Sequence, residues 1–217
     1  MAKTKFTERD IQRLYDRASS STFFMKLDAI LGRSTEKSLY RKKAISLLHL
    51  TPNSTILEIA CGIGYNFEIV QSYLHGKGHY VAIDISPRSL AVANGKIKSN
   101  GWTNMELINT SISRYNPKCK FDAILCTYAL TIIPDYKTAI NKMHDLLKPE
   151  GRFAIIGMKL SRKYPYKIFN SLLYRLSLPA GIDYKRKVIP YLVSKFKIDY
   201  YESIFMDYCY ILSGTKK

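Results

Sequence analysis

Residues 54–64 read Ser-Thr-Ile-Leu-Glu-Ile-Ala-Cys-Gly-Ile-Gly, and this stretch decides the fold. Its first part, Ser54–Ala60, is an apolar run rich in β-branched residues, which is typical of a buried strand. The strand ends in Gly62-Ile63-Gly64, a glycine turn whose backbone can approach a ligand closely. Ligands of open parallel sheets bind outside the carboxyl ends of the strands. The stretch therefore predicts an α/β protein with a binding site at this turn.

Strand and helix patterns alternate through the rest of the middle segment. The expected strands are Ser54–Ala60, His79–Ile83, Met105–Ile108, Phe121–Cys126 and Phe153–Gly157. The expected helices are Tyr65–Leu74, a helix from Pro87 to about Ser99 with Ser86 as N-cap, and Asp135–Leu147. This alternation predicts βαβ units and a doubly wound, mostly parallel sheet.

The two ends of the chain differ in pattern from the middle. Lys197–Phe205 and Asp207–Ser213 are strand-like runs separated only by Met206, which predicts a closing hairpin, seven strands in all and an antiparallel last strand. At the N-terminus, Thr7 and Asp10 form a weak capping box before one helix, and Thr35–Leu48 is a second helix. We expect a single domain over residues 1–217, with a helical cap (1–50), a core (51–157), and lid helices with the hairpin (158–217).

Composition limits the class of protein. Of 217 residues 47% are hydrophobic, which is enough for a core, and no apolar run reaches the roughly 18 residues of a membrane span. Met1–Lys5 is basic with no hydrophobic stretch behind it, unlike a signal peptide. The four cysteines show neither CxxC spacing nor histidine pairing, so we expect no disulfide framework, no metal site and a cytoplasmic location.

The formal net charge of +17 is concentrated in the flanks. Residues 1–50 contribute +6, residues 51–157 contribute +3 and residues 158–217 contribute +8. Such flanks attract phosphate groups of nucleic acid or of an anionic membrane. The alternative is an ordinary basic surface without a partner.

Two acidic residues limit which ligands the site can bind. Asp84 ends the second strand 20 residues after Gly64, where a carboxylate is placed to bind ribose hydroxyls. A dinucleotide-binding GxGxxG turn is broken by Phe67, and no P-loop Gly-Lys-Ser/Thr occurs. Glu58 would repel a pyrophosphate but suits a cationic amino group. S-adenosylmethionine has that amino group, a ribose diol and an adenine.

Residues 55–157 resemble the core of class I S-adenosylmethionine-dependent methyltransferases, with a Rossmann-like fold. The resemblance rests on four motifs in order: Leu57–Gly64, Ala82–Pro87, Phe121–Ile124 and Leu147–Phe153. Ala60 replaces the first glycine of the usual first motif. Thr110-Ser111 replaces the acid that often contacts adenine in this family, so the adenine end is less well defined.

The resemblance implies S-adenosyl-L-methionine as cofactor and a set of residues that hold it. Glu58, Gly62 and Gly64 would hold the methionine and ribose portions, and Asp84 the ribose diol. Ile85, Ser111 and Ile112 would lie near the adenine, and Cys126 and Thr127 beside the methionine.

No residue is required for the chemistry, because the donor is already activated and the protein mainly positions the acceptor. Tyr15 and Tyr128 are the candidates for the acceptor side, and Tyr164, Tyr166 and Tyr201 are further aromatic candidates for holding a cationic product. The motifs of amino-group methyltransferases of nucleobases and the Pro-Cys and Thr-Cys nucleophiles of RNA cytosine enzymes do not occur. Cys126 is expected to be a buried strand-end residue rather than a nucleophile.

The flanks suggest the acceptor class. Lys159–Leu178 places an apolar stripe beside basic residues, as in a helix that lies on an anionic membrane or packs on its own domain. Tyr15-Asp16-x-Ala18 and the C-terminal strand resemble the quinone-biosynthesis and phospholipid N-methyltransferase groups, although the Phe-Gly-x-Arg-Asn signature of the quinone group is missing. We expect a small or lipid-like acceptor, such as a phospholipid amine, met by a peripheral protein at a membrane surface. The alternatives are an RNA methyltransferase, a methyltransferase of quinones or other small metabolites, and a non-catalytic donor-binding module.

Overall fold

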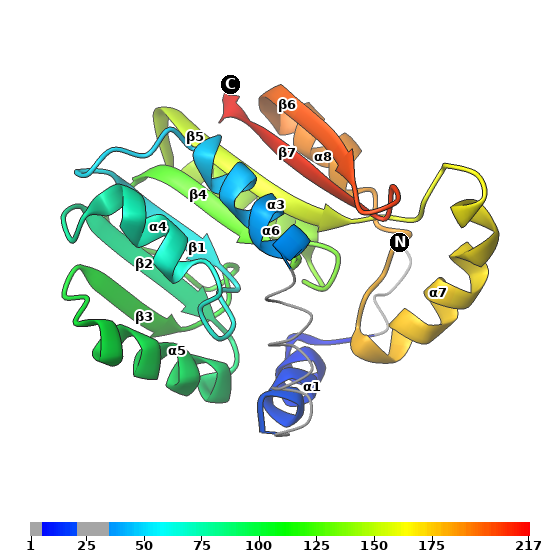
Figure 1. The fold of residues 1–217 in the computed structure, drawn as a ribbon, viewed down its shortest axis with the longest axis horizontal. Helices are drawn as coiled ribbons and strands as arrows, with labels where there is room; N and C mark the ends of the chain where they lie inside the picture. The colour runs from blue at the N-terminus through cyan, green and yellow to red at the C-terminus, as the bar shows by residue number, and fades with distance from the viewer. Residues whose placement is uncertain (1–5, 21–34) are drawn as a thin grey trace.

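A seven-stranded sheet forms the centre of the computed structural model, which describes residues 6–20 and 35–217 (Figure 1). The expectation about a signal peptide rests on Met1–Lys5, which lie outside the described residues. The strand order is β3-β2-β1-β4-β5-β7-β6, and only β7 runs antiparallel to its neighbours. The strands are β1 (Thr55–Ile59), β2 (His79–Asp84), β3 (Met105–Asn109), β4 (Phe121–Thr127), β5 (Leu147–Met158), β6 (Phe196–Ile204) and β7 (Cys209–Lys216). The predicted doubly wound, seven-stranded sheet is confirmed.

Helices cover both faces of the sheet. They are α1 (Glu8–Ser20), α3 (Thr35–Ser46), α4 (Phe67–Leu74), α5 (Pro87–Asn100), α6 (Tyr136–Leu146), α7 (Asn170–Ser177) and α8 (Val188–Lys195). Two short 3-10 turns, Tyr166–Phe169 and Leu178–Ala180, flank α7. Helices α3, α4 and α5 pack on one face and α6 and α8 on the other, so the apolar core has two halves.

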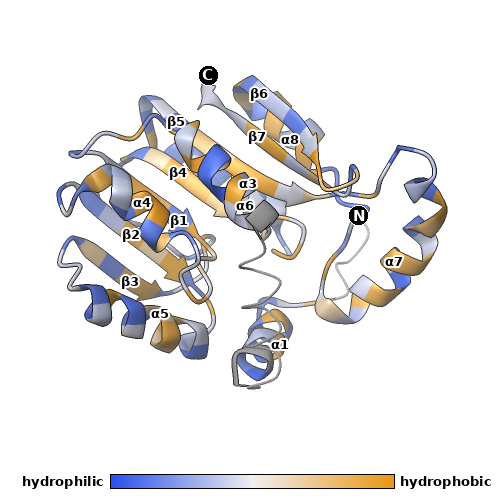
Figure 2. Cartoon of the chain, in the orientation of Figure 1, coloured by the Kyte–Doolittle hydropathy of each residue, from blue (hydrophilic) through white to orange (hydrophobic). Residues whose placement is uncertain are grey.

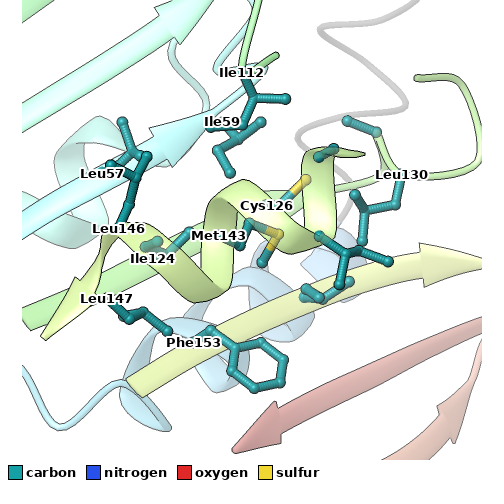
Figure 3. Close-up of a cluster of buried hydrophobic side chains, with 14 of the residues drawn as sticks. Leu57, Ile59, Ile112, Ile124, Cys126, Leu130, Met143, Leu146, Leu147 and Phe153 are labelled. Carbon is teal, nitrogen blue, oxygen red and sulfur yellow. The ribbon is translucent and has the colours of Figure 1, made fainter. Parts of the chain in front are cut away.

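Alternation along the strands assigns each side chain to one half of the core. In β4, Ile124 and Cys126 face α6, whereas Ala123 and Leu125 face the opposite half. Figure 3 shows Cys126 among the buried side chains around Met143 of α6. Burial of each large apolar side chain stabilises the fold by about 1.5–3 kcal/mol, so both halves contribute to holding the strand ends in place.

Local signals in the sequence predicted several helix ends. Ser86 caps α5, with its hydroxyl accepting a hydrogen bond from the Ser89 N–H at 3.1 Å. Asp135 caps α6 in the same way through Thr138. The capping box of Thr7 and Asp10 is also present, with reciprocal hydrogen bonds of 2.9 and 3.3 Å. Helix α4 begins at Phe67 rather than Tyr65, because residues 60–66 form the turn that follows β1.

The C-terminal hairpin has a longer turn than predicted. Four residues, 205–208, separate β6 from β7, and Phe205, Met206 and Asp207 all have positive φ. The buried Asp207 carboxylate accepts hydrogen bonds from Ser203, Lys159 and the Arg162 N–H. These contacts keep Asp207 in the turn rather than in the strand.

The segment expected to be a lid helix is only partly helical. Residues 159–165 are irregular, and the α-helix starts at Asn170, because Ser161 and the Arg162 N–H are bound to the hairpin turn. Figure 2 shows that α7 carries apolar residues while it extends away from the sheet. The apolar stripe of α7 and of the turn before it is exposed at Ile168 (59%), Leu172 (58%) and Leu176 (68%). No helix in the described ranges is long and apolar enough to cross a bilayer.

Candidate functional site

A cavity of about 480 Å³ lies at the carboxyl ends of β1, β2 and β4. It is the position expected for a ligand of a doubly wound sheet. Six of the nine residues predicted to hold the donor line this cavity: Gly62, Asp84, Ile85, Ser111, Ile112 and Thr127. The other three, Glu58, Gly64 and Cys126, do not line it.

Each of those three residues has a different position. Glu58 is fully buried behind the cavity wall. Gly64 lies one step past the lining residue Ile63, and a Cβ there would come within 2.5 Å of the Phe67 ring. Cys126 belongs to the core below α6, where burial raises the pKa of its thiol to about 12. The thiol is therefore neutral and enclosed, as expected for a structural cysteine.

The Asp84 carboxylate joins the turn after β1 to the end of β2. One oxygen accepts a hydrogen bond from the Gly62 N–H and the other from the Ser86 N–H, both at 2.8 Å. Burial raises the pKa of Asp84, while these backbone hydrogen bonds oppose the shift. Each carboxylate oxygen has further acceptor capacity, so both remain able to bind hydroxyl groups in the cavity.

Glu58 is the centre of a buried polar network. Its carboxylate accepts hydrogen bonds from the Asn66 amide at 2.5 Å and from the Tyr80 hydroxyl. Burial raises the pKa of Glu58 to about 7, although hydrogen bonds from Tyr80 and Asn66 and the charge of Arg41 act in the opposite direction. A cation bound nearby would favour the charged carboxylate.

Arg41 is a site residue that the sequence patterns did not single out. Its guanidinium donates to Asn66 at 2.8 Å and to the Thr127 hydroxyl at 2.9 Å, and it lies over the rings of Tyr65 and Tyr128. Its Nε is buried and has no hydrogen-bond partner among the described residues. Of the described residues that line the cavity, Arg41 is the only cation, so the cavity holds one fixed positive charge near the buried acid Glu58.

Two further features suit a nucleoside ligand. The Ser111 hydroxyl is buried in the cavity wall without a partner in the described part of the chain, so it can bind a polar group of a ligand. The space beside Gly62 is open, because no atom lies within 4 Å of the position that a Cβ would take there. Ala60, at the place of the first glycine of the motif, has a positive φ of 55°, a left-handed conformation that costs about 1 kcal/mol in a non-glycine residue.

The five tyrosine candidates separate into two groups. Tyr15 and Tyr128 both line the cavity, and Tyr128 has the unusual positive φ of 61° at the end of β4. Tyr164, Tyr166 and Tyr201 do not line it, and Tyr164 is 81% exposed. Of these five tyrosines, Tyr15 and Tyr128 are therefore the two placed to contact a molecule in the cavity, which is also lined by Tyr65.

The part of the cavity away from the predicted donor residues is mainly apolar. Its walls come from α1, from the loop after β4, from the end of β5 and from the segment after α7: Glu8, Ile11, Tyr15, Tyr128, Ala129, Ile132, Ile133, Pro134, Met158 and Ile182, of which Glu8 alone is charged. Helix α1 is held over the cavity at two points. The Ser86 hydroxyl donates to Asp16 at 2.7 Å, and the buried Ile11 packs against Gly181.

Comparison with known families places the cavity in context. A family model described as a methyltransferase domain matches residues 50–194. The demethylmenaquinone methyltransferase of Lactococcus lactis is 28% identical over 178 residues, covering 81% of this chain and 69% of that protein. The enzyme of the same name from Listeria monocytogenes is 24% identical over 180 residues, covering 82% and 74%.

Solved structures share the fold at lower sequence identity. The N-methyltransferase NodS from Bradyrhizobium japonicum, in complex with S-adenosyl-L-homocysteine, superposes with a TM-score of 0.73 at 17% identity, covering 95% of this chain and 98% of that one. The geranyl diphosphate C-methyltransferase of Streptomyces coelicolor superposes with a TM-score of 0.77 at 11% identity, covering 96% and 98%.

Proposed function

Because the chain belongs to the S-adenosylmethionine-dependent methyltransferases, with S-adenosylmethionine as methyl donor, we propose that its acceptor is an amphiphile met at the surface of an anionic membrane. The donor supplies an activated methyl group when bound. The residues of this chain then have to hold the acceptor in line with that methyl group and exclude water.

The apolar part of the cavity carries this proposal. Apart from the predicted donor residues, the wall is built mainly from isoleucines together with Met158, Pro134 and three tyrosines, and its charged side chains are Glu8 and Arg41. A wall of this kind favours the apolar portion of an acceptor, since burial of apolar surface is the main gain and few polar groups are available to satisfy a polar one. We assign Tyr15 and Tyr128 to the acceptor side and the six predicted residues that line the cavity to the donor, with Glu58 acting from behind the wall.

Helix α7 supports the membrane part of the proposal. The exposed apolar stripe of α7 and the turn before it is flanked by Lys163, Lys167 and Arg175, the arrangement of an interfacial helix that inserts apolar side chains and attracts anionic headgroups. Ile182, just after α7, lines the cavity. An acceptor leaving the bilayer at α7 would therefore be close to the cavity wall.

Two acceptor classes fit an amphiphile. The relatives named demethylmenaquinone methyltransferase favour a quinone precursor. The missing quinone signature favours a phospholipid amine, which we prefer. An RNA acceptor is the alternative in which the basic flanks bind phosphates, and it is disfavoured by the apolar wall of the cavity.

Transfer of methyl groups in the presence of vesicles tests the membrane part. We expect acceptors in vesicles containing anionic lipid to be methylated faster than the same acceptors in neutral vesicles. Leu172→Glu with Leu176→Glu should abolish this difference by placing charge on the apolar stripe. The matched control is Leu39→Glu, a leucine of α3 that is 57% exposed and lies away from α7. Equal rates in anionic and neutral vesicles for the unmodified protein would refute membrane docking.

A further inference from the structure

A second cavity, of about 910 Å³, lies between the hairpin, α8 and the segment that leads into α7. We call it the basic chamber, because six cationic residues line it: Lys159, Arg162, Lys167, Lys185, Arg186 and Lys187. No aspartate or glutamate is among its described lining residues. Its apolar floor includes Val188, Ile198 and Leu212.

Only two of the six cations have a carboxylate partner in the described part of the chain. Lys159 pairs with Asp207, and Arg186 lies 3.7 Å from Asp183. Arg162, Lys167, Lys185 and Lys187 form no ion pair with a described acid. Four like charges around one cavity repel one another, so an anion in the chamber would be stabilised.

A buried hydroxyl among the residues that line the chamber is the second, independent observation. Tyr210 lines the chamber, is 1% exposed, and its hydroxyl has no hydrogen-bond partner among the described residues. A buried polar group without a partner is costly, and in native proteins it often marks a position that a ligand or water fills. The Tyr210 ring packs directly against the backbone of Gly157, since a Cβ at that position would overlap the ring. It also stacks on the ring of Tyr201, with 6.2 Å between the ring centroids.

The basic chamber adjoins the cavity at the carboxyl ends of β1, β2 and β4, which we call the donor cavity after the ligand proposed for it. Met158 lines both cavities, and Arg186 donates hydrogen bonds to the backbone oxygens of Thr131 and Ile133, in the loop that also forms the donor cavity wall. The two cavities are therefore neighbours, with Met158 in the wall of each.

We propose that the basic chamber is a second ligand site, which binds the phosphate group of an amphiphile. A phosphate carries up to two negative charges and several acceptor oxygens, which suits four unpaired cations and a free hydroxyl donor better than a single carboxylate does. The apolar floor accommodates the adjoining alkyl portion. One part of this proposal rests on the proposed function, namely that the molecule that carries the phosphate is an amphiphile. The phosphate belongs either to the acceptor itself or to a lipid headgroup.

Calorimetric titration with hexyl phosphate, a soluble monoester that forms no bilayer, tests the site directly. We expect saturable binding that Arg162→Gln with Lys187→Gln weakens by about tenfold or more, since charged hydrogen bonds are lost. Both residues are exposed, so the variant should fold. The matched control is Lys77→Gln with Lys98→Gln, which removes two exposed charges elsewhere and should change binding less than about twofold, as screened surface charges do. Absence of saturable binding, or equal weakening in both variants, would overturn the proposal.

Tyr210→Phe gives a second measurement that does not alter charge. We expect weaker hexyl phosphate binding with no loss of thermal stability, because the hydroxyl has no partner among the described residues. Unchanged hexyl phosphate affinity would show that this hydroxyl does not contact the ligand and would overturn its role.

Two further measurements distinguish a phosphate of the acceptor from a phosphate of a lipid headgroup, and distinguish failure of the chamber proposal from failure of the proposed function. Inhibition of methyl transfer by hexyl phosphate, absent in Arg162→Gln with Lys187→Gln, identifies the phosphate as part of the acceptor. Binding of hexyl phosphate without such inhibition, together with weaker binding of that variant to phosphatidic acid vesicles, identifies a lipid headgroup. Hexyl phosphate binding in the absence of methyl transfer to any amphiphile would refute the proposed function while supporting the chamber.

Discussion

The Asp84 carboxylate accepts a hydrogen bond of 2.8 Å from the Gly62 N–H, which ties the end of β2 to the turn after β1. The two residues are 22 positions apart in the chain, and both line the donor cavity. The same carboxylate therefore fixes the turn and remains available to a ligand. Loss of this carboxylate would therefore affect both the conformation of the turn and the cavity that the turn lines.

Asp84→Ala should weaken binding of S-adenosylmethionine by about 1.5–3 kcal/mol, the cost of losing a charged hydrogen-bond partner. Asp84→Asn should weaken it less, because one side-chain oxygen remains to accept from Gly62 or Ser86. Calorimetric titration of the donor measures both effects. Unchanged affinity in Asp84→Ala would mean that the ribose lies elsewhere.

The pKa of Glu58, raised by burial to about 7 from an ordinary value of 4.5, makes stability depend on pH. Below pH 4.5 the carboxyl is protonated in both the folded and unfolded states. Between pH 4.5 and about 7 only the unfolded state loses the proton, so the folded state loses stability as the pH rises. The loss should be on the order of 3 kcal/mol and should level off above pH 7.

Denaturant unfolding of the unmodified protein and of Glu58→Gln between pH 4 and 8 measures this dependence. As the pH rises over that range, the unfolding free energy of the unmodified protein should fall relative to that of Glu58→Gln, because glutamine does not titrate. A constant difference would show that Glu58 titrates normally. Donor affinity should also rise through pH 7 in the unmodified protein alone, since the ammonium group favours the charged carboxylate.

Arg41→Gln should weaken donor binding by about tenfold or more, because Arg41 is the only described cation in the cavity wall and we expect it to bind the donor's carboxylate. Arg41→Lys should restore only part of the affinity, since lysine cannot bind Asn66 and Thr127 in the same planar geometry. Lys42→Gln, at an exposed neighbouring position of α3 outside the cavity, is the control.

A smaller ligand makes the test of Arg41 specific. Methylthioadenosine has the nucleoside and sulfur but no amino acid carboxylate, so its affinity should be the same in Arg41→Gln and in the unmodified protein. Equal weakening of both ligands would instead indicate that the substitution disturbs the cavity as a whole.

Tyr15→Phe and Tyr128→Phe should each lower turnover without unfolding the protein, because both side chains line the cavity, on the side that we propose for the acceptor. Steady-state kinetics, together with thermal melting, separates loss of turnover from loss of fold. Tyr164→Phe serves as control, since Tyr164 is 81% exposed and does not line the cavity. If both cavity variants match the unmodified enzyme, neither hydroxyl takes part.

The fold could be predicted from the sequence because its signals are local. Ser86 caps α5 through a residue three positions away, and the strands β1, β2 and β4 are mainly apolar. The position of the cavity could be predicted where its wall follows strand ends, as at Gly62 and Asp84. These features need no knowledge of distant contacts.

Arg41 could not be found in this way, because its hydrogen bonds join residues 25 and 86 positions apart. The basic chamber likewise gathers residues from β5, the segment before α7, the segment before α8 and the hairpin. The turn at Asp207 was predicted as strand because its residue pattern gives no sign of the bonds from Lys159 and Arg162. The position of Arg41, the basic chamber and the turn at Asp207 all depend on tertiary contacts, which a local sequence pattern does not contain.

The most direct test of the proposed function follows methyl-labelled S-adenosylmethionine into a cell extract that is then divided into lipid, RNA and aqueous fractions. Label in the lipid fraction, lost in Asp84→Ala, is the result we predict. Label in RNA, or only in water-soluble metabolites, would contradict the proposal of an amphiphilic acceptor.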